Sequence, residues 1–230
     1  RSVDLIFALP KQTMAEWRED LEQAIALGLD HLSLYNLTYE DDTPLTLMMQ
    51  RGEVEPLPEA VQAEMFEYTI GRCRNAGLHQ YEVSNFAKLG RESLHNTLYW
   101  RCENWLGIGP SAHSGFDGRR WGNVADHRVY AKRMLDDGTL PVAFEEENDL
   151  EAQADEMLLM GLRLRAGVKD IDMRSRLGFG IAERCGPALD ELAGQGLVDW
   201  DGSVLKASEQ GLPLLDAIVL ELTRAPMALA

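Results

Sequence analysis

Residues 1–38 contain a strand, a helix and a second strand in succession, and this pattern constrains the fold more than any other part of the sequence. Residues 3–9 form a nearly continuous apolar run, which is typical of a strand buried on both faces. Thr13 and Glu16 have the spacing of a capping box and predict a helix that ends at Gly28. Residues 31–38 have the composition of a strand. Because two strands joined through a helix run parallel with a right-handed crossover, the sequence predicts an α/β fold.

The pattern changes after this unit. The residues predict, in order, a polar loop 40–47, a helix 58–77, a strand 80–86, an irregular stretch 93–122, a helix 128–135, an extended segment 140–147 and a helix 150–165. Two short helices and a hairpin around Asp201-Gly202 follow, and a helix over 212–222 ends the pattern. This order predicts a winged-helix-like module. We therefore place one domain at residues 1–138 and a second, mostly helical one at 139–230.

Charge and cysteine usage limit the classes of function. The formal net charge is −16, which disfavours binding to nucleic acid or to anionic lipid. No run of about 18 apolar residues is present, so we expect no membrane span. The cysteines, Cys73, Cys102 and Cys185, form no C-x-x-C pair, which indicates reduced thiols and a cytoplasmic protein. Because Arg1 leads directly into an apolar strand without a leader, we expect the sequence to be part of a longer chain.

Two places in the sequence have residues suited to bind a ligand. Asp4 is a charge inside an apolar strand, where it either pairs with a base or accepts hydrogen bonds from a ligand. Residues 95–100 place His95 beside Tyr99 and Trp100, and imidazole with aromatic faces suits a planar ligand such as haem. A hydrogen-bonded structural role for His95 is the alternative.

The segment from Gly107 to Ala112 matches the spacing G-x-G-x-x-A of a dinucleotide-binding loop, but its context does not fit. Pro110 lies inside it, no strand of sufficient length precedes it, and no helix is expected to begin after it. We interpret it as a glycine-rich turn whose backbone approaches a ligand or another strand closely. The histidines show no metal-ligand spacing.

Several strings, taken in order, resemble one family. They are D-L-I-F-A-L-P-K-Q-T from Asp4, L-S-L-Y-N-L from Leu32, Y-E-V-S-N-F-A from Tyr81, H-N-T-L-Y-W from His95 and the segment from Gly107 to Ser114. Together they are similar to the oxygen-independent coproporphyrinogen III oxidase-like radical S-adenosylmethionine (SAM) proteins, and within these to the HemW-like haem chaperones. The resemblance implies the C-terminal part of a partial (β/α)6 radical-SAM barrel, followed by the winged-helix-like domain.

The resemblance also implies cofactors and partners. Asp4, Thr38 and His113 would lie near bound SAM, while His95, Tyr99 and Trp100 would bind haem, with His95 as the ligand of the haem iron. A protein that accepts haem and a second copy of the chain are the further partners considered. A [4Fe–4S] cluster is implied as well, but the family's C-x-x-x-C-x-x-C motif is not in this sequence.

The sequence departs from the family at one further position, because Ala8 replaces a usual glycine. We expect this change to be mild if the backbone there has a negative φ. Three functions stay open: haem handling, oxidative decarboxylation of coproporphyrinogen III by a SAM-derived radical, and a winged-helix binding module. Whether the complete protein is an enzyme is not decided; without cluster cysteines, this chain alone is expected to be inactive.

Overall fold

A computed structural model describes residues 1–224 of the chain. The contacts between residues divide it into two compact units, and the division falls between Ser93 and Leu94. The predicted boundary after residue 138 does not coincide with this division. That the parts before and after residue 138 differ in function stays a prediction. Each unit is described by itself below.

The first unit begins with the predicted strand, helix and strand. Strand β1 (Ser2–Phe7) and strand β2 (His31–Asn36) are parallel neighbours, joined through helix α1 (Met14–Ala26). The capping box at the start of α1 is present: the Thr13 amide donates to Glu16 Oε2 at 2.7 Å, and the Glu16 amide donates to Thr13 Oγ1 at 3.2 Å. The prediction of a βαβ unit is thus confirmed.

The rest of the first unit differs from the prediction in two places. Helix α2 (Pro44–Gln50) begins within the predicted loop and occupies its second half, because Thr43 caps it and Pro44 suits its first turn. The single strand predicted over 80–86 is a hairpin of β3 (His79–Glu82) and β4 (Asn85–Ala87). The chain reverses at Val83 and Ser84, where the Ser84 amide donates to the Glu82 carboxylate at 2.8 Å. β4 therefore runs antiparallel to β2.

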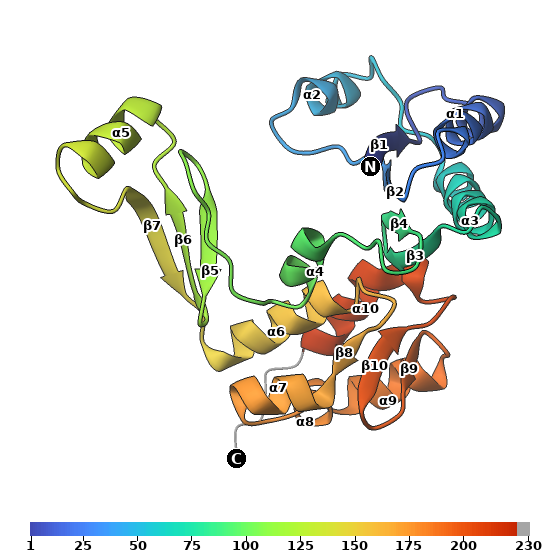
Figure 1. Cartoon of the computed structure of the whole chain (residues 1–230). Helices are drawn as coiled ribbons and strands as arrows, with labels where there is room; N and C mark the ends of the chain where they lie inside the picture. Colours follow the sequence, from blue (N-terminus) through green and yellow to red (C-terminus); the bar gives the residue numbers. More distant parts are fainter. Residues whose placement is uncertain (225–230) are drawn as a thin grey trace. The chain divides into compact units, whose positions relative to one another are not determined.

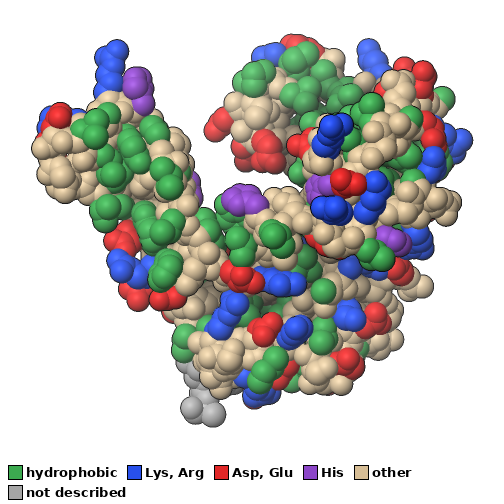
Figure 2. Space-filling view, in the orientation of Figure 1, with side chains coloured by type: hydrophobic (Ala, Val, Ile, Leu, Met, Phe, Trp, Pro, Cys, Tyr) green, Lys and Arg blue, Asp and Glu red, His purple; other side chains and the backbone are tan. Residues whose placement is uncertain are grey.

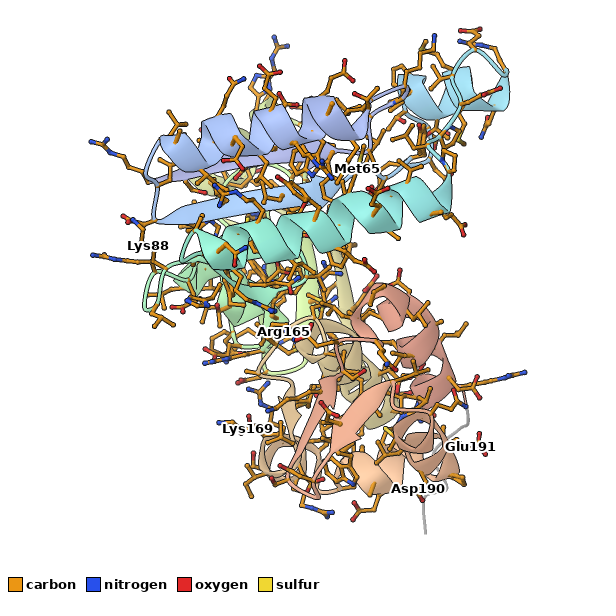
Figure 3. All side chains as sticks on the ribbon, turned by 90° about the vertical axis from the view of Figure 1, so that its right-hand side faces the viewer. Met65, Lys88, Arg165, Lys169, Asp190 and Glu191 are labelled. Carbon is orange, nitrogen blue, oxygen red and sulfur yellow. The ribbon has the colours of Figure 1, made fainter. Side chains whose placement is uncertain are left out.

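The four strands form a sheet in the order β1-β2-β4-β3, and its core lies on one face. Helices α1 and α3 (Glu59–Asn75) lie along the same side of this sheet (Figure 1). Trp17 of α1 stacks on Phe7 at 5.1 Å and donates its indole N–H to Thr69 Oγ1 at 2.9 Å. Met65 points from α3 into the layer between the helices and the sheet and is fully buried (Figure 3).

The second unit begins with helix α4 (Leu94–Trp100), although the sequence predicted an irregular stretch there. Three antiparallel strands follow in the order β5-β6-β7, with helix α5 between the last two (Figure 1). Their bounds are β5 (His113–Phe116), β6 (Arg119–Asn123), α5 (His127–Leu135) and β7 (Val142–Glu147).

The remainder of the second unit has the winged-helix-like order that the sequence predicted. Its short sheet has the order β8-β10-β9, and the β9–β10 hairpin turns at Asp201 and Gly202. The bounds are α6 (Leu150–Gly161), β8 (Val168–Lys169), α7 (Asp170–Leu177), α8 (Ile181–Cys185), α9 (Pro187–Gly194), β9 (Val198–Trp200), β10 (Val204–Ala207), the 3-10 helix η1 (Leu212–Leu214) and α10 (Leu215–Thr223). Within residues 1–224 we find no helix with the length and apolar character to cross a membrane.

Candidate functional site

Helix α4 presents an imidazole and a phenol side by side. His95 and Tyr99 are one helical turn apart, and their rings meet edge to face with centroids 4.9 Å apart. His95 is exposed and Tyr99 is half-buried. Because the helix holds His95 against an aromatic edge and leaves the imidazole open, a planar ligand could reach a ring nitrogen of His95. The prediction that His95 lies in a loop is wrong, since residues 94–100 are helical.

Trp100 lies on another side of α4 from His95 and Tyr99. Its ring has the guanidinium of Arg163 above it, 4.7 Å from the centroid, and its indole Nε1 is buried with no hydrogen-bond partner among the described residues. Because Trp100 comes five residues after His95, its side chain projects from a different face of the helix. The role predicted for Trp100 in binding haem is not tested by this geometry; its ring packs within the second unit.

Trp105 is a second aromatic partner of Tyr99. The Tyr99 and Trp105 rings meet edge to face at 5.0 Å, and the guanidinium of Arg120 lies 5.7 Å from the centre of the Trp105 ring. Trp105 also lines a cavity of about 530 Å³ in the second unit. The sequence did not single out Trp105 because it lies ten positions after His95, outside the motif, and reaches Tyr99 only through the fold.

The first unit has a row of polar side chains on the face of its sheet opposite α1 and α3. Asp4, Ser33, Asn85 and Glu82 are consecutive cross-strand neighbours in β1, β2, β4 and β3. Asp4 is exposed, whereas Asn85 and Glu82 are buried. The Asn85 side-chain amide donates to Glu82 Oε1 at 2.5 Å, and its Oδ1 is buried without a hydrogen-bond partner in the described part of the chain. An acceptor of this kind fits a ligand that donates hydrogen bonds.

Thr38 and His113 are the other two residues predicted to lie near SAM. Thr38 is exposed and follows the end of β2, whereas Asp4 is level with Ser33, so the two are separated along the strand direction. His113 begins β5 in the second unit, where its ring contacts Phe144 at 5.4 Å. That all three surround one ligand stays a prediction.

Ala8, at the end of β1, has a φ of +62°, so the expectation of a mild replacement of glycine does not hold. An L-residue in the left-handed region is disfavoured by about 1–2 kcal/mol. Ala8 is nevertheless buried at 3% exposure in the turn that follows the strand. The turn after β1 therefore contains local strain at a position that favours glycine.

The glycine-rich turn approaches another strand, as the sequence predicted. A Cβ at Gly107 would lie 2.1 Å from the carbonyl oxygen of His113, so only glycine fits there. The Asn123 side chain donates to the Gly109 carbonyl at 3.0 Å, and the Gly109 amide donates to the Tyr130 hydroxyl at 3.2 Å. β5, not a helix, follows this turn, which agrees with the rejection of a dinucleotide-binding loop.

His31 is a buried histidine that sequence reasoning did not single out. Its Nδ1 is hydrogen-bonded to Ser2 Oγ at 2.9 Å and its Nε2 to the Tyr81 hydroxyl at 2.9 Å. Burial lowers the pKa of His31, although the charge of Asp4 opposes this effect. The neutral imidazole thus links β1, β2 and β3 across the face that carries Asp4.

The residues of this chain do not fit an iron–sulfur cluster. Such a cluster is held by cysteine thiolates close together in space. Burial raises the pKa of Cys73 and Cys185 to about 12 and that of Cys102 to about 11, which disfavours their thiolates. Within residues 1–224, no group of three or more His, Cys, Asp or Glu side chains is placed to hold a metal ion.

Comparisons with known proteins agree with the predicted fold class and with the ordered motifs. Residues 148–214 match the family described as HemN C-terminal domain. The solved structure titled coproporphyrinogen III oxidase (HemN) from Escherichia coli, a radical SAM enzyme, superposes with a TM-score of 0.73 at 19% identity, covering 96% of this chain and 54% of that one. This superposition confirms the predicted fold class.

Curated relatives have a higher sequence identity to the chain than this solved structure has. It is 34% identical over 210 residues to "Heme chaperone HemW" of Bacillus subtilis (strain 168), covering 91% of this chain and 55% of that protein. It is 35% identical over 218 residues to HemW of Mycobacterium tuberculosis (strain CDC 1551 / Oshkosh), covering 95% and 54%. The mouse "Radical S-adenosyl methionine domain-containing protein 1, mitochondrial" is 34% identical over 238 residues, with 96% and 52% covered. The chain spans about half the length of these relatives, and over that length it is similar to the HemW- and HemN-like radical SAM proteins.

Proposed function

We propose that the chain handles haem in the manner of the haem chaperones it resembles, with haem bound at the His95 side of α4. The observation that carries this proposal is the exposed imidazole of His95 held at 4.9 Å from the Tyr99 ring. An exposed imidazole is a ligand for haem iron, and an adjacent aromatic edge favours a planar macrocycle. Haem is the cargo in this proposal and not a resident cofactor.

Haemin titration followed by the Soret band tests the proposal. We expect His95→Ala to change the Soret spectrum and to weaken haemin binding by at least about ten-fold. His127→Ala is the matched control, because His127 is also an exposed histidine at the start of a helix in the second unit. A His95→Ala protein with the spectrum and affinity of the unmodified chain would refute His95 as the iron ligand.

SAM is the cofactor we propose for the polar face of the first sheet. Asp4 and the Oδ1 of Asn85, which has no partner among residues 1–224, would accept hydrogen bonds from amino or hydroxyl groups of the ligand, with Thr38 as the further predicted contact within this unit. In a complete radical SAM protein, a [4Fe–4S] cluster would supply the electron for SAM cleavage, but the residues of this chain do not fit that cluster. Isothermal titration calorimetry of the Asp4→Asn variant with SAM tests whether Asp4 contacts the ligand. An affinity equal to that of the unmodified chain would reject Asp4 as a SAM contact.

Radical decarboxylation of coproporphyrinogen III is the alternative function. It requires cluster ligands that this chain does not supply, so we place it second. Anaerobic reconstitution of the full-length protein, followed by an assay for protoporphyrinogen, separates the two. Product formation would favour the oxidase, and haem transfer without product would favour the chaperone.

A nucleic-acid-binding role for the winged-helix-like module is disfavoured by its charge. Helix α9 follows α7 and α8 and precedes the hairpin, which is the position of a recognition helix in such modules. It carries Asp190 and Glu191, both exposed and pointing outward (Figure 3), and its sequence has no Lys or Arg. Because acidic side chains repel phosphate, we assign this module to packing within the second unit.

The partners that we propose are haem, a protein that accepts it and a second copy of the chain, all in the cytoplasm. Size-exclusion chromatography with light scattering, with and without haemin, measures whether the chain dimerises. A monomer under both conditions would remove the second copy from this proposal.

A further inference from the structure

The cavity beside Trp105 lies close to the candidate haem ligand. Two edge-to-face ring contacts, of 4.9 Å and 5.0 Å, lead from the His95 imidazole through Tyr99 to the Trp105 indole. Trp105 is a wall of the cavity of about 530 Å³. A volume of this size is within the range of small-molecule sites in proteins. The cavity and the exposed imidazole thus belong to one continuous region of the second unit.

The indole wall is held rigidly in place. Trp105 and Gly115 exchange two backbone hydrogen bonds, of 2.8 Å and 3.0 Å. The indole ring lies directly over Gly115, since a Cβ added there would be 2.4 Å from the ring. The flat face is therefore fixed before any ligand binds, which reduces the entropy lost on binding.

The polar lining of the cavity contains one cation that has no acidic partner. Arg120 is paired with Glu156. Arg176 instead donates from Nη1 to the carbonyls of Arg101 and Cys102 at 3.0 Å and 2.9 Å, and no carboxylate in residues 1–224 lies within ion-pair distance of it. Its Nε and Nη2 groups are thus left to donate to a ligand.

The acidic lining limits where an anion can bind. Asp117 accepts a hydrogen bond from the Asn104 side chain at 2.9 Å, and Glu156 is held by Arg120. Glu103 lines the same cavity as Arg176 and has no cation within ion-pair distance in the described part of the chain. A ligand carboxylate would therefore be attracted by Arg176 and repelled by Glu103.

We propose that this cavity receives a carboxylate-bearing edge of the tetrapyrrole bound at His95, with Arg176 as the anion partner and Trp105 as the flat wall. The inference rests on the proposed haem function and names the part of the ligand that the second unit recognises. Phe116, Met157 and Leu177 supply apolar lining for the macrocycle. A guanidinium with free donors suits a propionate carboxylate, because such hydrogen bonds are charge-assisted.

Haemin and haemin dimethyl ester form a matched pair of probes, since esterification removes the carboxylate charges and leaves the iron and the ring unchanged. We expect the unmodified chain to prefer haemin, and Arg176→Gln to weaken haemin binding about ten-fold with little effect on the ester. Glu103→Gln should act in the opposite direction and strengthen haemin binding without changing the binding of the ester. Arg128→Gln is the control, because Arg128 is an exposed arginine of the same unit outside the cavity.

The outcomes separate this proposal from the haem function itself. If Arg176→Gln and Glu103→Gln keep the preference of the unmodified chain for haemin over its ester, the cavity assignment is wrong while His95 ligation stands. If His95→Ala leaves the Soret spectrum unchanged, the proposed haem ligation by His95 is itself wrong, and the cavity proposal that rests on it is wrong as well. Arg176→Lys retains the charge but not the fork geometry, and we expect it to keep part of the preference. Equal losses for both ligands in Arg176→Lys and Arg176→Gln would show that Arg176 only supports the end of α4, which would overturn the proposal.

Discussion

The β1-β2-β4-β3 sheet and the β5-β6-β7 sheet are both small, but they are stabilised in different ways. The first buries a cluster of large side chains under α1 and α3, including Phe7, Trp17 and Phe86. The second buries no large apolar side chain: its buried positions are Ser114, Gly115 and Gly122. The first sheet is therefore stabilised mainly by the hydrophobic effect, and the second by ladder hydrogen bonds and side-chain contacts.

The difference leaves apolar surface around the second sheet. Figure 2 shows hydrophobic side chains gathered on the outside of the part that contains α5 and β5–β7. The exposed apolar residues there are Leu106, Ile108, Phe116, Val129, Met134, Leu135, Leu140 and Phe144. Because a buried core is absent from these described residues, ordered contacts such as Trp105 on Gly115 matter more to the local structure than they would in the first sheet.

Two phenylalanines give the strongest test of this comparison. Phe86 is 1% exposed in β4 and Phe144 is 42% exposed in β7. We expect Phe86→Ala to lower the free energy of unfolding of the first unit by about 3–5 kcal/mol. Phe144→Ala should lower that of the second unit by less than about 1 kcal/mol. Hydrogen-exchange mass spectrometry, read separately for peptides of each unit, measures both free energies of unfolding. Similar losses of stability in the two variants would contradict the difference proposed between the two sheets.

Gly115→Ala should be a damaging small substitution in the second sheet. Its Cβ would lie 2.4 Å from the Trp105 ring, so the indole or the strand must move, at about 1–3 kcal/mol. Gly71→Ala is the control in the first unit: it lies in the interior of α3 with open space around the new Cβ, and it should stabilise by about 0.5–1 kcal/mol. Denaturant unfolding followed by Trp fluorescence compares them. A neutral Gly115→Ala would mean that the wall of the cavity is not rigid.

The strained turn after β1 predicts a stabilising substitution within the first unit. With φ at +62°, Ala8→Gly should raise the free energy of unfolding by up to about 1 kcal/mol, because glycine adopts this region at low cost. Ala63→Gly in α3 should lower it by about 1 kcal/mol, since Ala63 is an exposed helix residue. Opposite signs in thermal unfolding would confirm the strain, and two losses would contradict it.

The smallest expected effect is a pH dependence of the first unit alone. Burial lowers the pKa of His31 in the folded state, so folding favours the neutral imidazole. The unfolded chain then binds more protons, and the stability that His31 contributes is present above its unfolded pKa of about 6.5 and is lost as the pH falls below it. Comparing the Tm of the unmodified chain and His31→Gln between pH 8 and 5 checks this. Parallel curves for the two proteins would contradict it.

Some features of the fold follow from short stretches of sequence. The capping box of Thr13 and Glu16 marks the start of α1, and Asp201-Gly202 marks the β9–β10 turn. In that turn the Asp201 carboxylate accepts hydrogen bonds from the Ser203 side chain and from the Ser203 and Val204 amides, and these hold its pKa near 2. Signals of this kind are local because the partner atoms lie within a few residues.

The missed and misplaced elements have a common cause. The reversal at Val83 and Ser84 is marked by no Gly or Pro, and the strand formers Tyr81, Val83 and Phe86 favour one continuous strand. α4 was predicted as irregular because it has only seven residues and buries no side chain fully, which leaves no helical period to detect. In both cases propensity alone does not decide the conformation.

The sequence by itself determined the βαβ start and the winged-helix-like order of the C-terminal module, and its ordered motifs carry the resemblance to the relatives that the comparisons found. It also predicted His95 and Asp4 as residues for a ligand. Only the tertiary structure decided their companions: Trp105 beside Tyr99, with Trp100 turned away, and Asn85 in the row that begins with Asp4. The physical reason is that strand register and ring contacts join residues far apart in the chain, whereas caps and turns involve neighbours.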